Sequence, residues 1–259
     1  MSQADFERRF GGIARLYGDD VLERFAAAHV CVIGVGGVGS WAVEALARSG
    51  IGRLTLIDLD HIAESNVNRQ LPALDPYFGM AKVSALAERV RAINPECVVS
   101  EVEDFVDEDN LDALLGAGYD FVFDAIDSLK VKTAIAAWCV KHRQPFVVSG
   151  GAGGQMNPGL IRVGDLSETT NDPLLSNLRY NLRRRYGLPR EGRMRVPCVY
   201  STEQLIYPKA AACDIDAANT AAPQGLSCAG FGASMVVTAS FGLFAVAEAL
   251  KAIARPKKR

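Results

Sequence analysis

A glycine-rich loop and a run of polar side chains lie close together near the start of the chain, and both are of types that bind phosphate. The loop has the pattern GxGxxG, which allows a tight turn and brings backbone N–H groups close to an anion; its glycines are Gly34, Gly36, Gly37 and Gly39. The polar residues that follow are Asp58, Asp60, Ser65, Asn66, Asn68, Arg69, Gln70 and Lys82. Two cations so close to the loop favour a triphosphate over a dinucleotide. The pattern therefore predicts ATP binding.

Asp58 lies 19 residues after Gly39, at the end of the next predicted strand. A carboxylate there can accept hydrogen bonds from a ribose. A nicotinamide dinucleotide site uses the same glycines and the same acid, so an NAD-dependent oxidoreductase remains an alternative.

A third group of polar residues follows the apolar run Tyr119 to Ala125, which predicts a buried strand. The carboxyl ends of parallel strands form the ligand-binding edge of an open sheet, and Asp127 and Ser128 lie just beyond this one. We expect Asp127 to hold a divalent cation, Mg²⁺, against the phosphates, while a bound monovalent cation is left open.

Alternating apolar strand and helix patterns surround these groups and must position them. Strands are expected at Val30 to Ile33, Arg53 to Asp58, Pro145 to Ser149 and Leu160 to Val163, and helices at Ser40 to Arg48, Leu111 to Leu115 and Thr133 to His142. This order predicts an α/β fold, Rossmann-like, with a mostly parallel sheet, helices on both faces, and a C-terminal extension that carries extra strands and a basic insertion. We expect one domain over residues 1–259, with a nucleotide-binding core at about 10–150 and the extension at about 151–259. The loop Gly150 to Gly159 either caps the site or only turns the chain.

The basic insertion has seven arginines against the single acid Glu191; they are Arg179, Arg183, Arg184, Arg185, Arg190, Arg193 and Arg195. Clustered arginine with Tyr180 and Tyr186 suits phosphate contact and base stacking, so these arginines are the predicted RNA-binding residues. A solvated helix face is the alternative.

Composition excludes several other classes. A net charge of -2 gives no overall attraction to nucleic acid or membranes, and the polar start MSQADFERRF argues against a secretory signal. We expect a cytoplasmic protein with reduced thiols. None of the six cysteines forms a CxxC motif, so no zinc site is expected.

Residues 229–247 carry no Asp, Glu, Lys or Arg and approach the length of a membrane span. Their many small side chains suit close packing inside a protein. A buried helix is therefore preferred over a membrane-associated one.

The motifs GVGGVG, DLDHIAESNVNRQ, GMAKV and DAIDS resemble, in order and spacing, the adenylating domain of the ubiquitin-activating-enzyme superfamily. That superfamily includes the adenylyltransferases of molybdopterin and thiamine biosynthesis. The resemblance implies that Asp58 holds the ribose, that Asn66, Arg69 and Lys82 contact the phosphates, and that Asp127 binds Mg²⁺. RFGGIARLYG is similar to the family's opening helix, which implies that Arg15 approaches the triphosphate, from the partner in a homodimer. Catalytic roles are thus implied for Arg15, Arg69, Lys82 and Asp127.

The basic insertion, with LSETTNDPL before it and RVPCVYSTE after it, resembles the tRNA threonylcarbamoyladenosine dehydratases within that superfamily. This resemblance implies that ATP activates the threonyl carboxylate and that the neighbouring carbamoyl group closes a ring with loss of AMP. It also implies tRNA as a partner, together with a sulfur-acceptor protein of a cysteine-desulfurase system. Such a reaction needs no cysteine nucleophile, and the roles of Cys198, Cys213 and Cys228 stay open. The alternative within this enzyme class is an adenylyltransferase that acts on the C-terminus of a small sulfur-carrier protein, and a noncatalytic adapter with the same fold is a further one.

Overall fold

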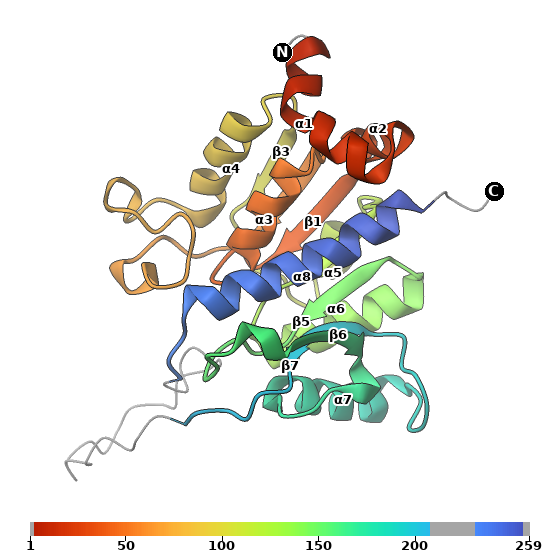
Figure 1. The fold of residues 1–259 in the computed structure, drawn as a ribbon. Coiled ribbons are helices and arrows are strands. Elements are labelled where there is room, and N and C mark those ends of the chain that lie inside the picture. Colours follow the sequence, from red (N-terminus) through yellow and green to blue (C-terminus); the bar gives the residue numbers. More distant parts are fainter. Residues whose placement is uncertain (1–2, 208–230, 256–259) are drawn as a thin grey trace.

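The computed structural model describes residues 3–207 and 231–255, and the strands among them form one sheet of seven (Figure 1). The order across the sheet is β3-β2-β1-β4-β5-β7-β6. The strands are β1 (His29–Ile33), β2 (Arg53–Ile57), β3 (Val98–Val102), β4 (Phe121–Asp124), β5 (Phe146–Ser149), β6 (Ile161–Asp165) and β7 (Pro197–Ser201). All neighbours pair in parallel except β6, which is antiparallel to β7. The predicted α/β fold with a mostly parallel sheet is confirmed, and the extension adds its two strands to the same sheet.

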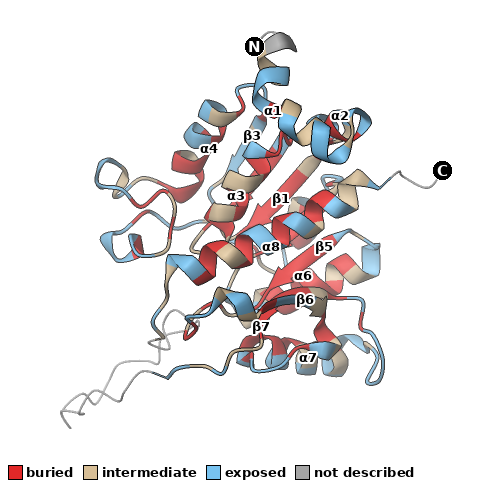
Figure 2. Cartoon of the chain, viewed as in Figure 1, coloured by how far each residue is buried: buried red, intermediate tan, exposed pale blue. Residues whose placement is uncertain are grey.

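Helices cover both faces of this sheet. They are α1 (Gln3–Tyr17), α2 (Asp19–Ala27), α3 (Gly39–Arg48), α4 (Lys82–Ile93), α5 (Leu111–Leu115), α6 (Leu129–His142), α7 (Pro173–Tyr186) and α8 (Met235–Ala254). One apolar cluster joins α2, α3, α4 and α8 to the sheet, and a second joins α5, α6 and α7 to it. The central strands are buried along almost their whole length, as Figure 2 shows, because helices shield them on both sides.

Helix α8 corresponds to the buried helix that was predicted at residues 229–247. It begins at Met235 and ends at Ala254, later at both ends than the segment read from charge alone. By length and composition it is the one helix in the described ranges that is apolar enough to cross a membrane, yet half of its most apolar window is buried. Its inward face, including Val237 and Phe241, packs in the core across α3 (Figure 1). The prediction of a buried helix is confirmed for this face.

A close backbone contact explains the small side chains of α8. A Cβ atom added to Gly242 would lie 2.6 Å from the carbonyl oxygen of Val38, just before α3. Only glycine lets the two helices approach this closely.

Other boundaries differ in detail from the expectation. Helix α5 has the predicted bounds, whereas α6 begins at Leu129, four residues before the predicted start, because its first turn buries the charged Lys132, which pairs with Asp124 and breaks the apolar pattern. The extra strand near Leu160 is β6, and it runs through Asp165.

Candidate nucleotide site and basic surface

The glycine-rich loop joins β1 to α3, and at two of its positions the surrounding atoms leave no room for a side chain. Gly34 has φ +81°, and a Cβ atom there would lie 2.8 Å from Cγ2 of Ile126. A Cβ atom on Gly39 would lie 1.9 Å from the carbonyl oxygen of Gly34. Glycine is required at both positions, so the loop folds tightly over the end of β1 and leaves the start of α3 open to an anion.

Asp58 follows β2 and is held against this loop by two backbone hydrogen bonds. Its Oδ2 accepts from the N–H of Val35 at 2.8 Å, and its Oδ1 accepts from the N–H of Asp60 at 2.9 Å. Burial raises the pKa of Asp58, while the charge of Lys82 and these two bonds oppose the rise. The carboxylate therefore has a fixed orientation before any ligand arrives.

Lys82 is the first residue of α4 and is only 5% exposed. Its Nζ donates to Oδ2 of Asp60 at 2.6 Å and lies 3.9 Å from Oδ1 of Asp58. The ammonium group thus lies between two carboxylates at the edge of the loop, where a phosphate group can compete for it.

Arg69 lies over the glycine-rich loop. A Cβ atom added to Gly37 would be 3.3 Å from its Cγ. Its guanidinium group donates to the carbonyl oxygen of Ser65 at 2.7 Å and to Oδ1 of Asn68 at 2.9 Å, and its own carbonyl oxygen accepts from the indole of Trp41 at 3.0 Å. Trp41 was not singled out from the sequence, because its role depends on this contact between distant segments.

The two asparagines of the same segment stabilise its turn. The side chain of buried Asn66 accepts a hydrogen bond from the N–H of Ala63 at 3.1 Å. That of Asn68 donates to the carbonyl oxygen of Ala233 at 2.8 Å, just before α8. Both asparagines were predicted to bind ATP. In the structure their side chains hold the backbone just before Arg69 in place.

Asp127 and Ser128 are exposed at the carboxyl end of β4, beside the loop that Ile126 contacts. Within the described ranges, no three His, Cys, Asp or Glu side chains gather closely enough to hold a metal ion by themselves. An ion at Asp127 would therefore take the rest of its oxygen ligands from phosphates and water. That donor set fits Mg²⁺, which binds through one or two carboxylates and keeps several waters.

Arg15 lies away from this group within its own chain. It is exposed near the end of α1, and that helix packs where the strands begin: Phe10 contacts Gly50, and the guanidinium group of Arg9 donates to the carbonyl oxygen of Ile93 at 2.7 Å. Arg15 thus lies at the edge of the sheet opposite the glycine-rich loop of its own chain, and its approach to the triphosphate from a dimer partner stays a prediction.

The predicted RNA-binding arginines lie along α7 and in the loop that follows it. Tyr180 and Tyr186 are exposed between them, as base stacking requires. Arg184 lies over the ring of Tyr180, with 5.9 Å between its Cζ and the ring centroid, and donates to its hydroxyl group at 3.0 Å. The exposed members of the set are Arg184, Arg185, Arg190, Arg193 and Arg195.

Two arginines of the set are held by the protein itself. Arg179 is half-buried and donates to the carbonyl oxygens of Leu166 and Thr169 at 3.0 Å each. The Nε of Arg183 donates to the carbonyl oxygen of Pro189 at 3.1 Å. Arg179 therefore serves the packing of α7, and Arg183 supports the loop that carries the later arginines.

The course of α7 separates this basic surface from the glycine-rich loop. Its N-cap residue Asp172 accepts a hydrogen bond from the N–H of Gly151, just after β5 ends, and the loop beyond α7 leads into the start of β7. The last turn of α7 and Arg190, Arg193 and Arg195 thus lie at the edge where the strands begin, opposite the nucleotide site.

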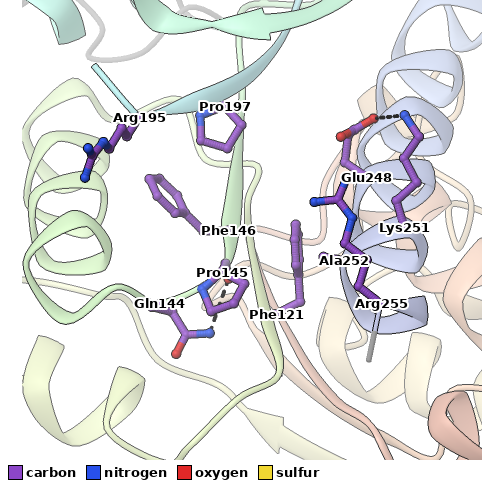
Figure 3. A pocket seen from close by; sticks show the side chains of 10 residues that line it. All are labelled: Phe121, Gln144, Pro145, Phe146, Arg195, Pro197, Glu248, Lys251, Ala252 and Arg255. Atoms are coloured by element: carbon purple, nitrogen blue, oxygen red, sulfur yellow. Dashed lines mark hydrogen bonds and ion pairs between the residues drawn. The ribbon is translucent and has the colours of Figure 1, made fainter. Parts of the chain in front are cut away.

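A cavity of about 280 Å³ opens at that same edge (Figure 3). Arg195 lines one side, and Lys251 and Arg255 at the end of α8 line the other, with Lys251 paired to Glu248 at 2.8 Å. The rest of the lining is mostly apolar and comes from Phe121, Gln144, Pro145, Phe146, Pro197 and Ala252. The cavity is separate from the nucleotide site.

Asp165 anchors the loop that carries Arg193 and Arg195. Its Oδ1 accepts from the N–H of Met194 at 2.8 Å, and its Oδ2 accepts from that of Val196 at 3.2 Å. Burial alone would raise the pKa of Asp165, but hydrogen bonds from the N–H of Met194 and from both the hydroxyl and the N–H of Ser167 outweigh it and lower the pKa below its usual value. The acid carried no motif that could have identified it from the sequence.

Cys198 is fully buried in β7, and burial raises its pKa far above the ordinary value. Since the thiolate is the nucleophile, this thiol is inert. Cys213 and Cys228 lie outside the described residues.

The loop from Gly150 to Gly159 is hydrogen-bonded to two distant parts of the chain. The N–H of Gly154 donates to the carbonyl oxygen of Gly232, and the carbonyl oxygen of Gly154 accepts from the N–H of Ile206, at 2.8 Å each. The loop therefore holds these segments together as well as turning the chain.

Comparison with known proteins extends over nearly the whole chain. The ThiF family matches residues 11–259. A protein of Escherichia coli named tRNA threonylcarbamoyladenosine dehydratase is 49% identical over 95% of this chain and 93% of its own length, and one of Haemophilus influenzae with the same name is 46% identical over 99% and 98%. The crystal structure of the E. coli dehydratase in complex with ATP has a TM-score of 0.87 and 48% identity, and covers 97% of this chain and 96% of that one.

Proposed function

This chain belongs to the ThiF family, and we propose that it is an ATP-dependent enzyme that dehydrates threonylcarbamoyladenosine in tRNA, next to the anticodon. The observation that carries the proposal is its likeness to relatives of that name over almost their full length. The grouping of Asp58, Lys82 and Arg69 around the glycine-rich loop supports it independently, because these side chains suit a nucleoside triphosphate.

In this proposal ATP binds across the end of β1. Asp58 accepts hydrogen bonds from the ribose, and its fixed orientation selects the position of the sugar. The N–H groups at the start of α3 face the phosphates, together with the side chains of Arg69 and Lys82. The other residues assigned to ATP are Gly34, Gly36, Gly37, Gly39, Asp60, Asn66, Asn68, Asp127 and Ser128. A related dehydratase crystallised with ATP and with AMP is consistent with this assignment.

The reaction begins when the threonyl carboxylate attacks the α-phosphate of ATP. An acyl-adenylate forms and pyrophosphate leaves. The oxygen or nitrogen of the neighbouring carbamoyl group then attacks the activated carbonyl carbon, the ring closes, and AMP leaves. The protein contributes orientation to this second step, because nucleophile and electrophile belong to one molecule.

Lys82 and Arg69 act on the charge that develops during adenylation. Lys82 leaves its pair with Asp60 for the phosphates, and the buried position strengthens its attraction to them. Asp127, with Ser128 beside it, would hold Mg²⁺, which neutralises charge on the triphosphate when bound. In a homodimer, Arg15 of one chain would reach the nucleotide of the other.

The exposed arginines of α7 and its loop bind the tRNA backbone in this proposal, and Tyr180 offers a ring for stacking. The nucleotide site and the basic surface lie at opposite edges of the sheet. A substrate that uses both must reach from one edge to the other, and a tRNA is long enough to do so. A sulfur-acceptor protein is proposed as a further partner, to be tested by co-purification.

The decisive experiment incubates the protein with ATP and with tRNA that carries threonylcarbamoyladenosine, and then weighs the released nucleosides. The proposal expects the loss of one water from that nucleoside, with one AMP formed per conversion. An unchanged nucleoside mass would refute it. Adenylation of a sulfur-carrier C-terminus, or tighter binding of NADH than of ATP, would instead support the alternative enzymes.

A further inference from the structure

An ion pair without access to solvent lies behind the nucleotide site. Lys132 of α6 and Asp124 at the end of β4 are both 0% exposed, and the Nζ of Lys132 lies 2.9 Å from Oδ1 of Asp124. Removing two charges from water is costly, and apolar residues of similar size often stabilise a fold as well. A buried pair at this place therefore calls for a role other than stability.

Asp124 connects the pair to the loop that carries Asp127. The same Oδ1 that receives the ammonium group also accepts a hydrogen bond from the N–H of Ile126 at 3.2 Å. Ile126 in turn contacts Gly34 so closely that no Cβ would fit there. Asp127 is the next residue, so the pair controls the backbone immediately before it.

The charge of Lys132 also reaches a second buried acid. Asp172 is 6% exposed, caps α7 through a hydrogen bond of 3.0 Å from the N–H of Leu175, and accepts from Gly151 as well. Burial raises the pKa of both Asp124 and Asp172, and Lys132 opposes the rise in each case. One buried cation thus lies behind the loop of Asp127 and the beginning of the basic helix.

We propose that Lys132 is a positioning residue for adenylation: through Asp124 it holds the backbone of residues 125–127 against Gly34, so that the Asp127 carboxylate faces the phosphates and the metal ion. This inference rests on the proposed role of Asp127. Residues that orient a metal ligand in this way commonly change metal affinity by about tenfold or more when they are replaced.

The test measures how Mg²⁺ strengthens ATP binding, by calorimetry on the full chain without tRNA. Wild-type protein gives the Mg²⁺ concentration at half-maximal strengthening. In Lys132→Met this concentration should rise by roughly tenfold or more, while ATP affinity in the presence of a chelator stays within about twofold. Arg89→Met is the matched control, because it breaks the partly exposed pair with Glu44 between α4 and α3 and should leave the Mg²⁺ dependence unchanged.

A second variant separates positioning from stability. Lys132→Met leaves Asp124 buried without its cation and can unfold the chain. The double variant Lys132→Met with Asp124→Leu removes both charges and also the oxygen that accepts from the N–H of Ile126, so the backbone before Asp127 is no longer held. It should be more stable to heat than Lys132→Met alone and keep the raised Mg²⁺ requirement.

Two outcomes would overturn the proposal. One is a double variant whose Mg²⁺ requirement equals that of the wild type. The other is an equal loss of ATP affinity with and without Mg²⁺, which would indicate general damage to the site. Neither outcome depends on tRNA, so a failure here is distinct from a failure to dehydrate the nucleoside.

Discussion

The two edges of the sheet present their charged side chains in different ways. At the carboxyl edge, Asp58 and Lys82 are held by several partners and are nearly buried. At the amino edge, Arg185, Arg190 and Arg193 extend into solvent. A small ligand needs side chains with fixed geometry, because misplacement of the reacting atoms slows a reaction greatly. A long polyanion needs only charge along its path, since counterion release supplies most of the binding.

This comparison implies different responses to salt and to substitution. Nucleotide binding at the carboxyl edge should depend on single residues and little on salt. RNA binding at the amino edge should depend on the sum of several charges and strongly on salt.

Replacing Asp127 is expected to have the largest effect. Asp127→Ala should lower the rate of AMP formation with tRNA by about 100-fold or more, because the Asp127 carboxylate is the one protein ligand proposed for the metal ion. The measurement is AMP release by chromatography, with circular dichroism to show that the fold is intact. Asp75→Ala, an exposed acid outside the site, is the control; wild-type turnover by Asp127→Ala would remove the metal assignment.

The next largest effect is expected for Lys82→Met, which should weaken ATP binding. The carboxylates of Asp58 and Asp60 would then face the phosphates without their cation, and we expect the dissociation constant for ATP to rise by about tenfold or more. Calorimetry measures this constant. Lys130→Met on the exposed face of α6 should bind as the wild type does, and equal affinities for both variants would contradict the role of Lys82.

At the amino edge, replacing Arg183, Arg184 and Arg185 by Ala should weaken tRNA binding several-fold. The slope of log affinity against log salt should fall by about one for each phosphate group that the protein no longer neutralises, and ATP affinity should not change. Arg179→Ala is the contrasting variant, because its guanidinium group is engaged with the carbonyl oxygens of Leu166 and Thr169. It should lower the melting temperature and leave the salt slope unchanged; a slope changed equally by both would show that the inward and outward arginines do not differ.

The smallest effect concerns Asp165 and is a change in stability. Because its pKa is lowered in the folded chain, its ionised form stabilises the fold at pH above its unfolded value of about 4, and this contribution is lost as the pH falls through the folded value. Asp165→Asn should therefore cost about 1 kcal/mol at pH 7 and progressively less in acid. Urea unfolding at several pH values measures the difference. A cost that is constant with pH would contradict the assignment.

The carboxyl edge was largely predictable from sequence. The spacing of Gly34, Gly36 and Gly39 and the position of Asp58 follow from the geometry of one strand, one turn and one helix. Contacts between distant segments were not predictable in this way. Neither Trp41 beneath Arg69 nor Lys132 beside Asp124 belongs to a motif, because each depends on how separate elements pack.

The amino edge was predictable in composition but not in position. Seven arginines in a short stretch indicate a basic surface, yet the sequence did not distinguish Arg179, which points inward, from Arg185, which points outward. Nor did it show that α8 would contribute Lys251 and Arg255 to the same edge. These facts depend on how α7 and α8 pack against segments that are distant in the sequence.

Helix α7 also sets a distance. It starts beside Gly151 at one edge and, with 14 residues at 1.5 Å each, ends about 21 Å further on. The number of residues in α7 thus determines how far the arginines of its last turn lie from the proposed nucleotide site. Inserting four residues in the exposed part of the helix would move those arginines by about 6 Å and turn them by about 40°. The length of this helix therefore sets the distance between the proposed nucleotide site and the arginines that are proposed to bind RNA.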